Sequence, residues 1–434
     1  MYNKEERQLN EQKQVYDALA IPEKKIDDHI LTGLQRARKE TRHHIKRNWL
    51  IVAAIVAFIL VGFASTLKIM DVIKDNKGLM DAVDQDYYET LNLSSETIDG
   101  VTFTIDGVIK DTSGLVVFYT IDSEEPRSRL TLDEVQLMDA QGRQLDYSVL
   151  SYGKTTENPN GHSVSGILDY TFDDPLTLDD FELIADVVGS PYDGTIESGF
   201  SDTFAIPFSL THDVSDEKTY HLNETRTIDG QQVTFKKVVI QPLRTSVYIE
   251  MDPNNTKELL TFEDLHIVDE TGERWDRNTI GPTVEKLSNH ERVIHLQSNY
   301  FRNPDELYLV TDRIQALEKE ETIVEVDLDK ERIIQQPPGD IQMDVKMEDG
   351  YIIFTHPSVD TEEIVNDISF GTIKDQDGNL VESNSAYFTV DANNSGETEY
   401  GIQINNVSDL NGPLYFEIIA YPNWIDGDIK IPIR

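Results

Sequence analysis

The sequence contains no cysteine among its 434 residues. This absence excludes disulfide bonds, thiolate metal sites and thiol catalysis. A large protein without disulfide bonds must be held together by ordinary apolar cores, and a chain of this length is long enough to form several of them. We therefore expect several conventionally packed domains.

Positive charge is scarce as well, because 38 Lys/Arg residues stand against 80 Asp/Glu residues and give a net charge of −42. Residues 1–48 hold 11 basic and 8 acidic residues, about +3, so subtraction leaves 27 basic and 72 acidic residues, a net charge of −45, for residues 49–434. This balance argues against nucleic-acid binding, since phosphate contacts need clustered Lys/Arg. It repels anionic wall polymers and attracts a cationic ligand, although an acidic surface that only keeps the protein soluble explains the same charge.

Long hydrophobic runs are also rare, and the only uncharged stretch of 19 residues is WLIVAAIVAFILVGFASTL, residues 49–67. A helix of this length matches a hydrocarbon core of roughly 30 Å. The alternatives are a buried core helix, which usually has one polar face, and a signal peptide, which rarely follows a polar leader of this length. The run therefore predicts a transmembrane helix.

The residues flanking this run indicate its orientation in the lipid bilayer. Lys and Arg are in excess on the N-terminal side, with Arg42, Lys46 and Arg47 nearest the membrane and Trp49 expected at its inner interface. On the C-terminal side Lys and Asp are mixed. This asymmetry predicts a single-pass protein of the cell membrane, with a cytoplasmic N-terminus and an extracellular C-terminal region.

The cytoplasmic segment, residues 1–48, is predicted to form a helix over 22–46 that continues into the membrane. Ile26, Ile30 and Leu34 recur every four residues and form a narrow apolar stripe. So few large apolar side chains cannot form a core alone. The stripe therefore predicts a partner-binding surface, and the alternative is a solvated leader with a basic anchor.

Beyond the membrane, residues 68–90 are predicted to form a stalk with helical spacing that is broken at Gly78. From about residue 95 the apolar residues alternate with polar ones, in short runs rich in Val, Ile, Thr, Phe and Tyr. Gly and Asp turns separate these runs, as is typical of an all-β protein.

The sequence repeats itself at a shift of 130 residues, so that TIDGVTFTIDGV (97–108) falls on TIDGQQVTFKKV (227–238). A third, shorter copy contains GYIIFT (350–355), and Gly142, Gly272 and Gly378 are predicted to occupy equivalent hairpin turns. Each copy is expected to close on a short strand: FAIPFSL (204–210), TIVEVDL (322–328) and IKIPIR (429–434). We therefore predict three repeated, immunoglobulin-like β-sandwiches over residues 91–213, 214–336 and 337–434, with the clearest linker at QQPPGD (335–340).

No pattern of residues predicts catalysis. The ten histidines are scattered, and neither paired metal-ligand spacing nor a Gly-rich phosphate loop is present. DQDG (375–378) is similar to part of a calcium loop, but its counterparts DAQG (139–142) and DETG (269–272) lack the middle carboxylate, which favours ordinary turns. We expect no enzyme activity, no cofactor and no metal site.

Three stretches carry a resemblance to a known family. GLMDAV (78–83), followed by the IDGVTFTIDGVI and GLVVFYT runs (98–109 and 114–120), resembles Gram-positive single-span membrane proteins with an exterior domain of unknown function. These proteins are often encoded beside extracytoplasmic-function sigma factors. The absence of cysteine suits such an exterior region, but it also excludes the His/Cys zinc motif of the best-known cytoplasmic anti-sigma domain.

The resemblance implies a membrane-anchored anti-sigma-like regulator that links the cell envelope to a cytoplasmic sigma factor, held by Ile26, Ile30 and Leu34. The alternative is a structural or adhesive envelope protein with β-sandwich spacer domains and an inert cytoplasmic leader. The repeat architecture and the acidic exterior suit both interpretations.

Overall fold

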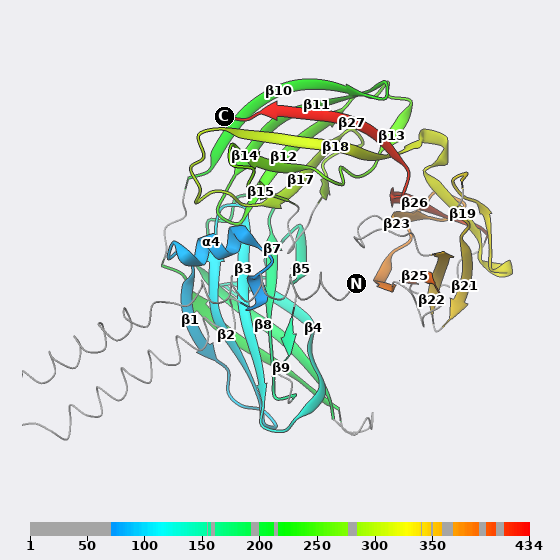
Figure 1. Ribbon diagram of the computed structural model, residues 1–434. Coiled ribbons are helices and arrows are strands. Elements are labelled where there is room, and N and C mark those ends of the chain that lie inside the picture. Colours follow the sequence, from blue (N-terminus) through cyan, green and yellow to red (C-terminus); the bar gives the residue numbers. More distant parts are fainter. Residues whose placement is uncertain are drawn as a thin grey trace, which may run out of the picture. The chain divides into compact units, whose positions relative to one another are not determined.

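The computed structural model describes most of the chain that follows residue 70. The described ranges are 71–153, 155–157, 161–191, 199–211, 216–276, 284–339, 341–348, 350–357, 368–389, 396–404 and 412–434. This part is mainly β, as the alternating pattern predicts, and contains the α-helix α4 (Lys77–Asp84) and the short 3₁₀ turns η2 (Lys319–Glu321) and η3 (Leu328–Lys330) (Figure 1).

Within the described ranges, no helix has both the length and the apolar character that a bilayer crossing requires. The predicted cytoplasmic segment 1–48 and the predicted transmembrane helix 49–67 lie outside those ranges, so both stay predictions.

The first sandwich packs a sheet of six strands against a sheet of three. The larger sheet consists, in spatial order, of β1 (Glu89–Ser94), β2 (Val101–Lys110), β3 (Gly114–Ser123), β7 (Ser163–Thr171) and β5 (Val149–Tyr152), with β6 (Thr156–Glu157) also paired to β7. The smaller sheet consists of β4 (Arg127–Asp139), β8 (Asp180–Pro191) and β9 (Phe200–Ser209). Side chains such as Phe103 and Val117 from one sheet and Leu183 and Phe204 from the other form a single core.

The second sandwich packs two sheets of five strands against each other. One sheet has the order β10 (Lys218–Ile228), β11 (Gln231–Ile240), β12 (Arg244–Met251), β17 (Glu291–Gln297) and β16 (Val284–Lys286). The opposite sheet contains β13 (Lys257–Leu259), β18 (Leu307–Glu318), β14 (His266–Asp269), β15 (Arg274–Trp275) and β27 (Trp424–Pro432). Phe235, Trp275 and Leu309 lie in its core.

The position of β27 differs from the sequence-based expectation that IKIPIR closes the third copy. β27 pairs antiparallel with β18, and Ile429 and Ile431 are buried in the core of the second sandwich. Figure 1 shows the red strand β27 beside β18. The second sandwich is therefore completed by a strand that follows it by more than 100 residues.

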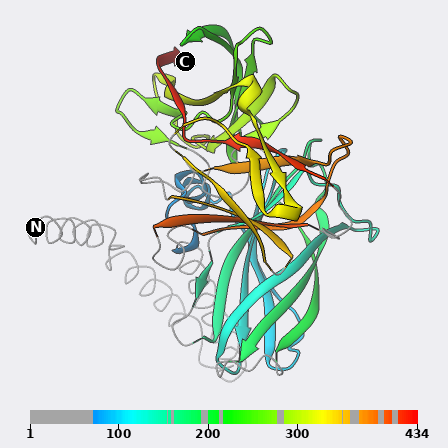
Figure 2. The same cartoon turned by 90° about the vertical axis from the view of Figure 1, so that its right-hand side faces the viewer.

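The third sandwich is inserted between β18 and β27. One sheet has the order β20 (Arg332–Gln335), β19 (Ile323–Asp327), β26 (Leu414–Ala420) and β23 (Ser369–Lys374), and the other has the order β21 (Asp344–Glu348), β22 (Tyr351–Pro357), β25 (Glu397–Ile404) and β24 (Ser383–Thr389) (Figure 2). TIVEVDL is thus β19 of the third sandwich, where Val324 pairs with Phe416, and does not close the second. The predicted linker at 335–340 connects β20 to β21 inside the third sandwich.

The three Asp-x-x-Gly segments form the same hairpin turn. Each Asp carboxylate accepts the backbone N–H groups two and four residues later, as Asp139 does from Gln141 and Arg143 at 2.8 and 2.9 Å. The glycines have φ of +73°, +86° and +82°, a region that favours residues without a Cβ. The N–H of Arg143 is the main reason why the pKa of Asp139 lies below its usual range. The carboxylates are therefore used to form turns.

Candidate functional site at the junction of the first two sandwiches

The described part of the predicted stalk, from residue 71 on, is packed against both sandwiches rather than forming a free stalk. Residues 71–88, which we name the docking segment, contain α4 and the buried side chains Val72, Ile73, Leu79 and Ala82. Asn76 caps the helix, because its side chain accepts the N–H of Leu79 at 3.0 Å. The spacing of apolar residues therefore correctly indicated helical structure.

The docking segment covers the outer face of the larger sheet of the first sandwich. Its apolar side chains contact Ile109, Val116, Phe118 and Ile167, which point away from the core of that sandwich, and also reach Leu243 of the second. The ring of Tyr88 lies 5.2 Å from the ring of Phe118 in an edge-on contact. Both faces of β3 are buried for this reason.

Gly78 does not break the helix at the point where the sequence suggested a break. It lies inside α4, and a Cβ at this position would come within 2.7 Å of the backbone N of Ser298. The glycine therefore lets the helix approach the backbone of the second sandwich closely, and this contact outweighs its poor helix propensity.

Polar contacts join the docking segment to the second sandwich. Arg302 donates two hydrogen bonds to the carboxylate of Asp81, at 2.7 and 2.6 Å, and this pairing raises the pKa of Arg302. The backbone N–H of Lys77 donates to the side chain of Gln297 at 2.9 Å. These hydrogen bonds attach α4 to the second sandwich and also fix its orientation there.

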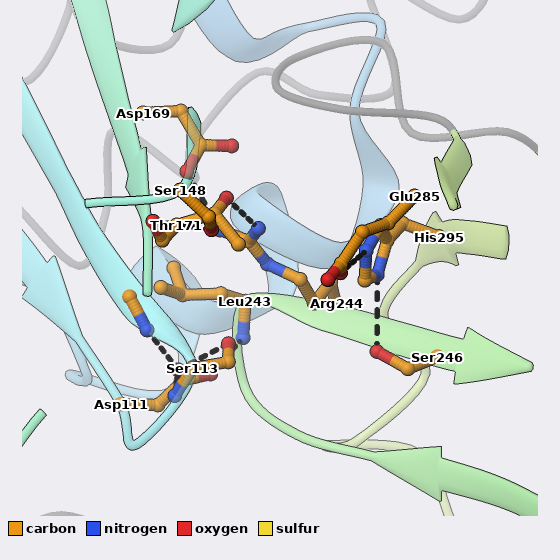
Figure 3. Close-up of polar contacts among 11 residues, drawn as sticks. Asp111, Ser113, Ser148, Asp169, Thr171, Leu243, Arg244, Ser246, Glu285 and His295 are labelled. Atoms are coloured by element: carbon orange, nitrogen blue, oxygen red, sulfur yellow. Dashed lines mark hydrogen bonds and ion pairs between the residues drawn. The ribbon is translucent and has the colours of Figure 1, made fainter. Parts of the chain in front are cut away.

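A buried ion pair connects the two sandwiches directly (Figure 3). Arg244, at the start of β12, donates to Asp169 of β7 at 2.6 Å and also to the hydroxyl of Thr171. The side chains of Arg244 and Asp169 are 1% and 3% exposed. Burial raises the pKa of Asp169, and the charge of Arg244 opposes that change.

Asp111 makes a second connection between the same two sandwiches. One carboxylate oxygen accepts from Ser113 and Gly114 of its own turn, and the other accepts the N–H of Leu243 at 2.8 Å (Figure 3). The side chain of Gln241 also donates to Thr112 at 2.7 Å. The turn between β2 and β3 is therefore bonded to the turn between β11 and β12.

His295 and Glu285 lie beside this junction, on β17 and β16. The Nδ1 atom of His295 is 3.0 Å from the hydroxyl of Ser246, and its Nε2 atom is 3.6 Å from the carboxylate of Glu285. Burial lowers the pKa of His295 most strongly, the charge of Arg244 lowers it further, and Glu285 opposes both. His295 is consequently neutral near pH 7.

An open cleft of about 500 Å³ borders these residues, lined by the first sandwich at Thr171 and Phe172 and by the second at Lys237, Tyr248 and His295. In the described ranges, no three His, Cys, Asp or Glu side chains are grouped so that they would hold a metal ion. The chemistry of the junction is that of a polar, charge-paired contact between folded parts.

Each sequence-predicted site residue falls outside the described ranges. This applies to the three partner-binding and four membrane-flanking residues: Ile26, Ile30, Leu34, Arg42, Lys46, Arg47 and Trp49. No sequence pattern pointed to the junction residues Arg244, Asp169 and Asp81. One signal was available, since the unbroken apolar run LVVFY (115–119) is typical of a strand buried on both faces.

Two family models match parts of the chain. A domain of unknown function (DUF4179) matches residues 42–123, and a family of unknown function (DUF5643) matches residues 217–347. The first match includes the predicted span, the docking segment and β1–β3, and the second includes β10–β18 and the first strands of the third sandwich.

A comparison with curated proteins finds no match. Among solved structures, the crystal structure of a conserved domain protein from Bacillus anthracis is similar, with 17% sequence identity and a TM-score of 0.40. The similarity covers 57% of this chain and 84% of that chain.

Proposed function

We propose that this protein is a non-catalytic, membrane-anchored regulator of the anti-sigma type, which links the cell envelope to a cytoplasmic sigma factor. Its N-terminal segment lies in the cytoplasm, residues 49–67 cross the bilayer, and the sandwiches lie outside. The match of residues 42–123 to DUF4179 supports this proposal, because that family is associated with anti-sigma-factor-like proteins.

The observation that carries the proposal is the docking segment. The docking segment, which begins at residue 71, contacts Phe118 of the first sandwich and Arg302 of the second. A change in how these two sandwiches pack against each other therefore changes the position of the segment that leads into the membrane. A spacer that only holds a domain away from the membrane needs no such contacts.

At the cytoplasmic end, the stripe formed by Ile26, Ile30 and Leu34 binds the sigma factor. Burying three such side chains contributes roughly 4–8 kcal/mol gross. Ordering of the segment offsets much of this, which leaves an affinity on the order of micromolar. Rearrangement or proteolysis of the exterior region then changes the affinity of the cytoplasmic segment for the sigma factor.

The first experiment tests the cytoplasmic end. The double variant Ile26→Asp/Ile30→Asp should release the sigma factor and raise transcription of its regulon, while membrane fractionation finds the protein still in the membrane. A pull-down with residues 1–48 that recovers no sigma factor, together with an unchanged regulon in the double variant, would refute the proposal.

The second experiment tests whether the exterior region signals or only acts as a spacer. Leu79→Asp places a charge in a fully buried position and should undock the segment, whereas Leu380→Asp makes the same change at a side chain that is 69% exposed. We expect the regulon to change several-fold in the first variant and not in the second. Hydrogen exchange in β8 and β18, which carry none of the residues packed against α4, shows whether the sandwiches stay folded.

The proposal extends to the origin of the exterior region, in which the three sandwiches are copies of one immunoglobulin-like unit. The matching strand orders of the sheets β1-β2-β3-β7-β5 and β10-β11-β12-β17-β16 and the three identical Asp turns support this relationship. An experimental structure that places Gly142, Gly272 and Gly378 in different strand connections would contradict it.

A further inference from the structure

A groove of about 660 Å³ opens on the first sandwich, and none of its lining residues lines the cleft at the junction. Its apolar lining comes from both sheets: Leu91 and Leu93 of β1 belong to one, and Phe181 and Phe208 of β8 and β9 belong to the other. The two phenylalanine rings are stacked with their centroids 5.3 Å apart. The apolar lining is therefore continuous with the core of the first sandwich.

The charged residues that line this groove are all acidic: Asp139, Asp180 and Glu182. Asp139 is used by its turn and pairs with Arg143 at 2.7 Å. Asp180 is exposed and accepts one hydrogen bond from Ser209 at 2.6 Å. The carboxylates of Asp180 and Glu182 therefore line the groove, and none of the other lining residues is Lys or Arg.

Strand pairing does not require the Glu182 carboxylate, as the second sandwich shows at the corresponding place. Glu182 lies opposite Pro207 in the first sandwich, and Tyr308 lies opposite Pro432 in the second. There the ammonium of Lys430 lies 4.0 Å from the centre of the Tyr308 ring. The same strand pairing thus holds Glu182 in the first sandwich and Tyr308, with Lys430 over its ring, in the second.

The strands that border the groove are also edge strands. Within the described residues, β1 pairs with β2 alone and β9 with β8 alone. An extended peptide pairs readily with such an edge, since alternate backbone N–H and C=O groups remain available. Its alternate side chains would then point toward the apolar lining.

We propose that this groove binds an extended, cationic, amphipathic peptide. Its apolar side chains cover the half-buried Leu91 and Leu93, and its Lys or Arg side chains pair with Asp180 and Glu182. The net charge of −45 on residues 49–434 attracts such a peptide over a longer range. This binding goes beyond the regulatory role and does not depend on it.

The test uses the full chain in nanodiscs of neutral lipid, with empty nanodiscs as the blank. The probe is a fluorescein-labelled peptide of alternating Lys and Leu, and binding is followed by fluorescence anisotropy. A peptide of alternating Glu and Leu is the control probe. We expect the cationic peptide to bind and the acidic peptide not to bind.

Two pairs of substitutions remove the same charge in different places. Asp180→Asn/Glu182→Gln should weaken binding at least tenfold, whereas Asp133→Asn/Glu134→Gln, at exposed positions of β4 outside the groove, should change it less than twofold. Ser209→Trp fills the groove from an exposed position without changing charge and should also abolish binding. Equal weakening by both charge pairs, unchanged binding in Ser209→Trp, or no binding by the unmodified protein would each overturn the proposal.

Discussion

Replacing Arg244 by Met should destabilise the junction of the first two sandwiches strongly. The substitution leaves the Asp169 carboxylate, only 3% exposed, without its cation at 2.6 Å. Removing one partner of a buried ion pair typically costs about 3–5 kcal/mol, because the remaining charge has lost both water and its partner. The substitution also removes the hydrogen bond to Thr171.

The double variant Arg244→Met/Asp169→Asn should cost less than the sum of the two single variants. Neither of its side chains leaves a buried charge unpaired, so we expect an interaction free energy of about 2 kcal/mol between the two positions. Arg292→Met is a suitable control, because Arg292 pairs with Glu258 at 3.3 Å and that carboxylate is 30% exposed. Solvent screening should keep the control's loss near 1 kcal/mol.

Native-state hydrogen exchange at the amides of β7 and β12 is the appropriate assay. A protein with several cores need not unfold in one step, so a global melting temperature would not isolate the junction. The opening free energy of these amides should fall by about 3–5 kcal/mol in Arg244→Met. Additive single variants, or an equal loss in the Arg292 control, would refute the reasoning.

Three further predictions follow from the same structure. Gly78→Ala should loosen the docking segment, because the added methyl group meets the backbone of Ser298 at 2.7 Å, and faster hydrogen exchange in α4 would report this. The junction should lose stability as the pH falls below 6.5, since burial lowers the pKa of His295 and the unfolded chain then takes up a proton that the folded chain resists. His295→Asn should reduce this pH dependence of the opening free energy, measured by hydrogen exchange at the β12 amides, and an equal pH dependence in the variant would contradict the prediction. Deleting residues 424–434 should remove the edge of the second sandwich and cause aggregation, whereas replacing residues 319–423 by a short Gly/Ser linker should leave that sandwich folded, as circular dichroism and size-exclusion chromatography would detect.

The candidate junction could be predicted only in part. The apolar run LVVFY indicates that β3 is buried on both faces, but it does not identify the segment that covers the outer face. Arg244 and Asp169 are 75 residues apart in the chain, and neither belongs to a recognisable motif. Their pairing depends on how two folded sandwiches meet, and a single sequence carries no local signal for such a contact.

The sequence by itself determined the local structure of this protein. Period-2 alternation specifies strands because only that spacing places every apolar side chain of an extended chain on one face. The Asp-x-x-Gly turns follow in the same way, since a short carboxylate and a residue without a Cβ satisfy the turn locally. Tertiary structure alone decided which strand joins which sheet.

TIVEVDL and IKIPIR have the same alternating pattern, yet β19 completes the third sandwich and β27 completes the second. Backbone hydrogen bonds along a sheet edge are the same for almost any strand, and alternation specifies only which face is buried. The choice of partner therefore depends on the shapes of the completed cores and on the connections between them, which exist only once the chain has folded.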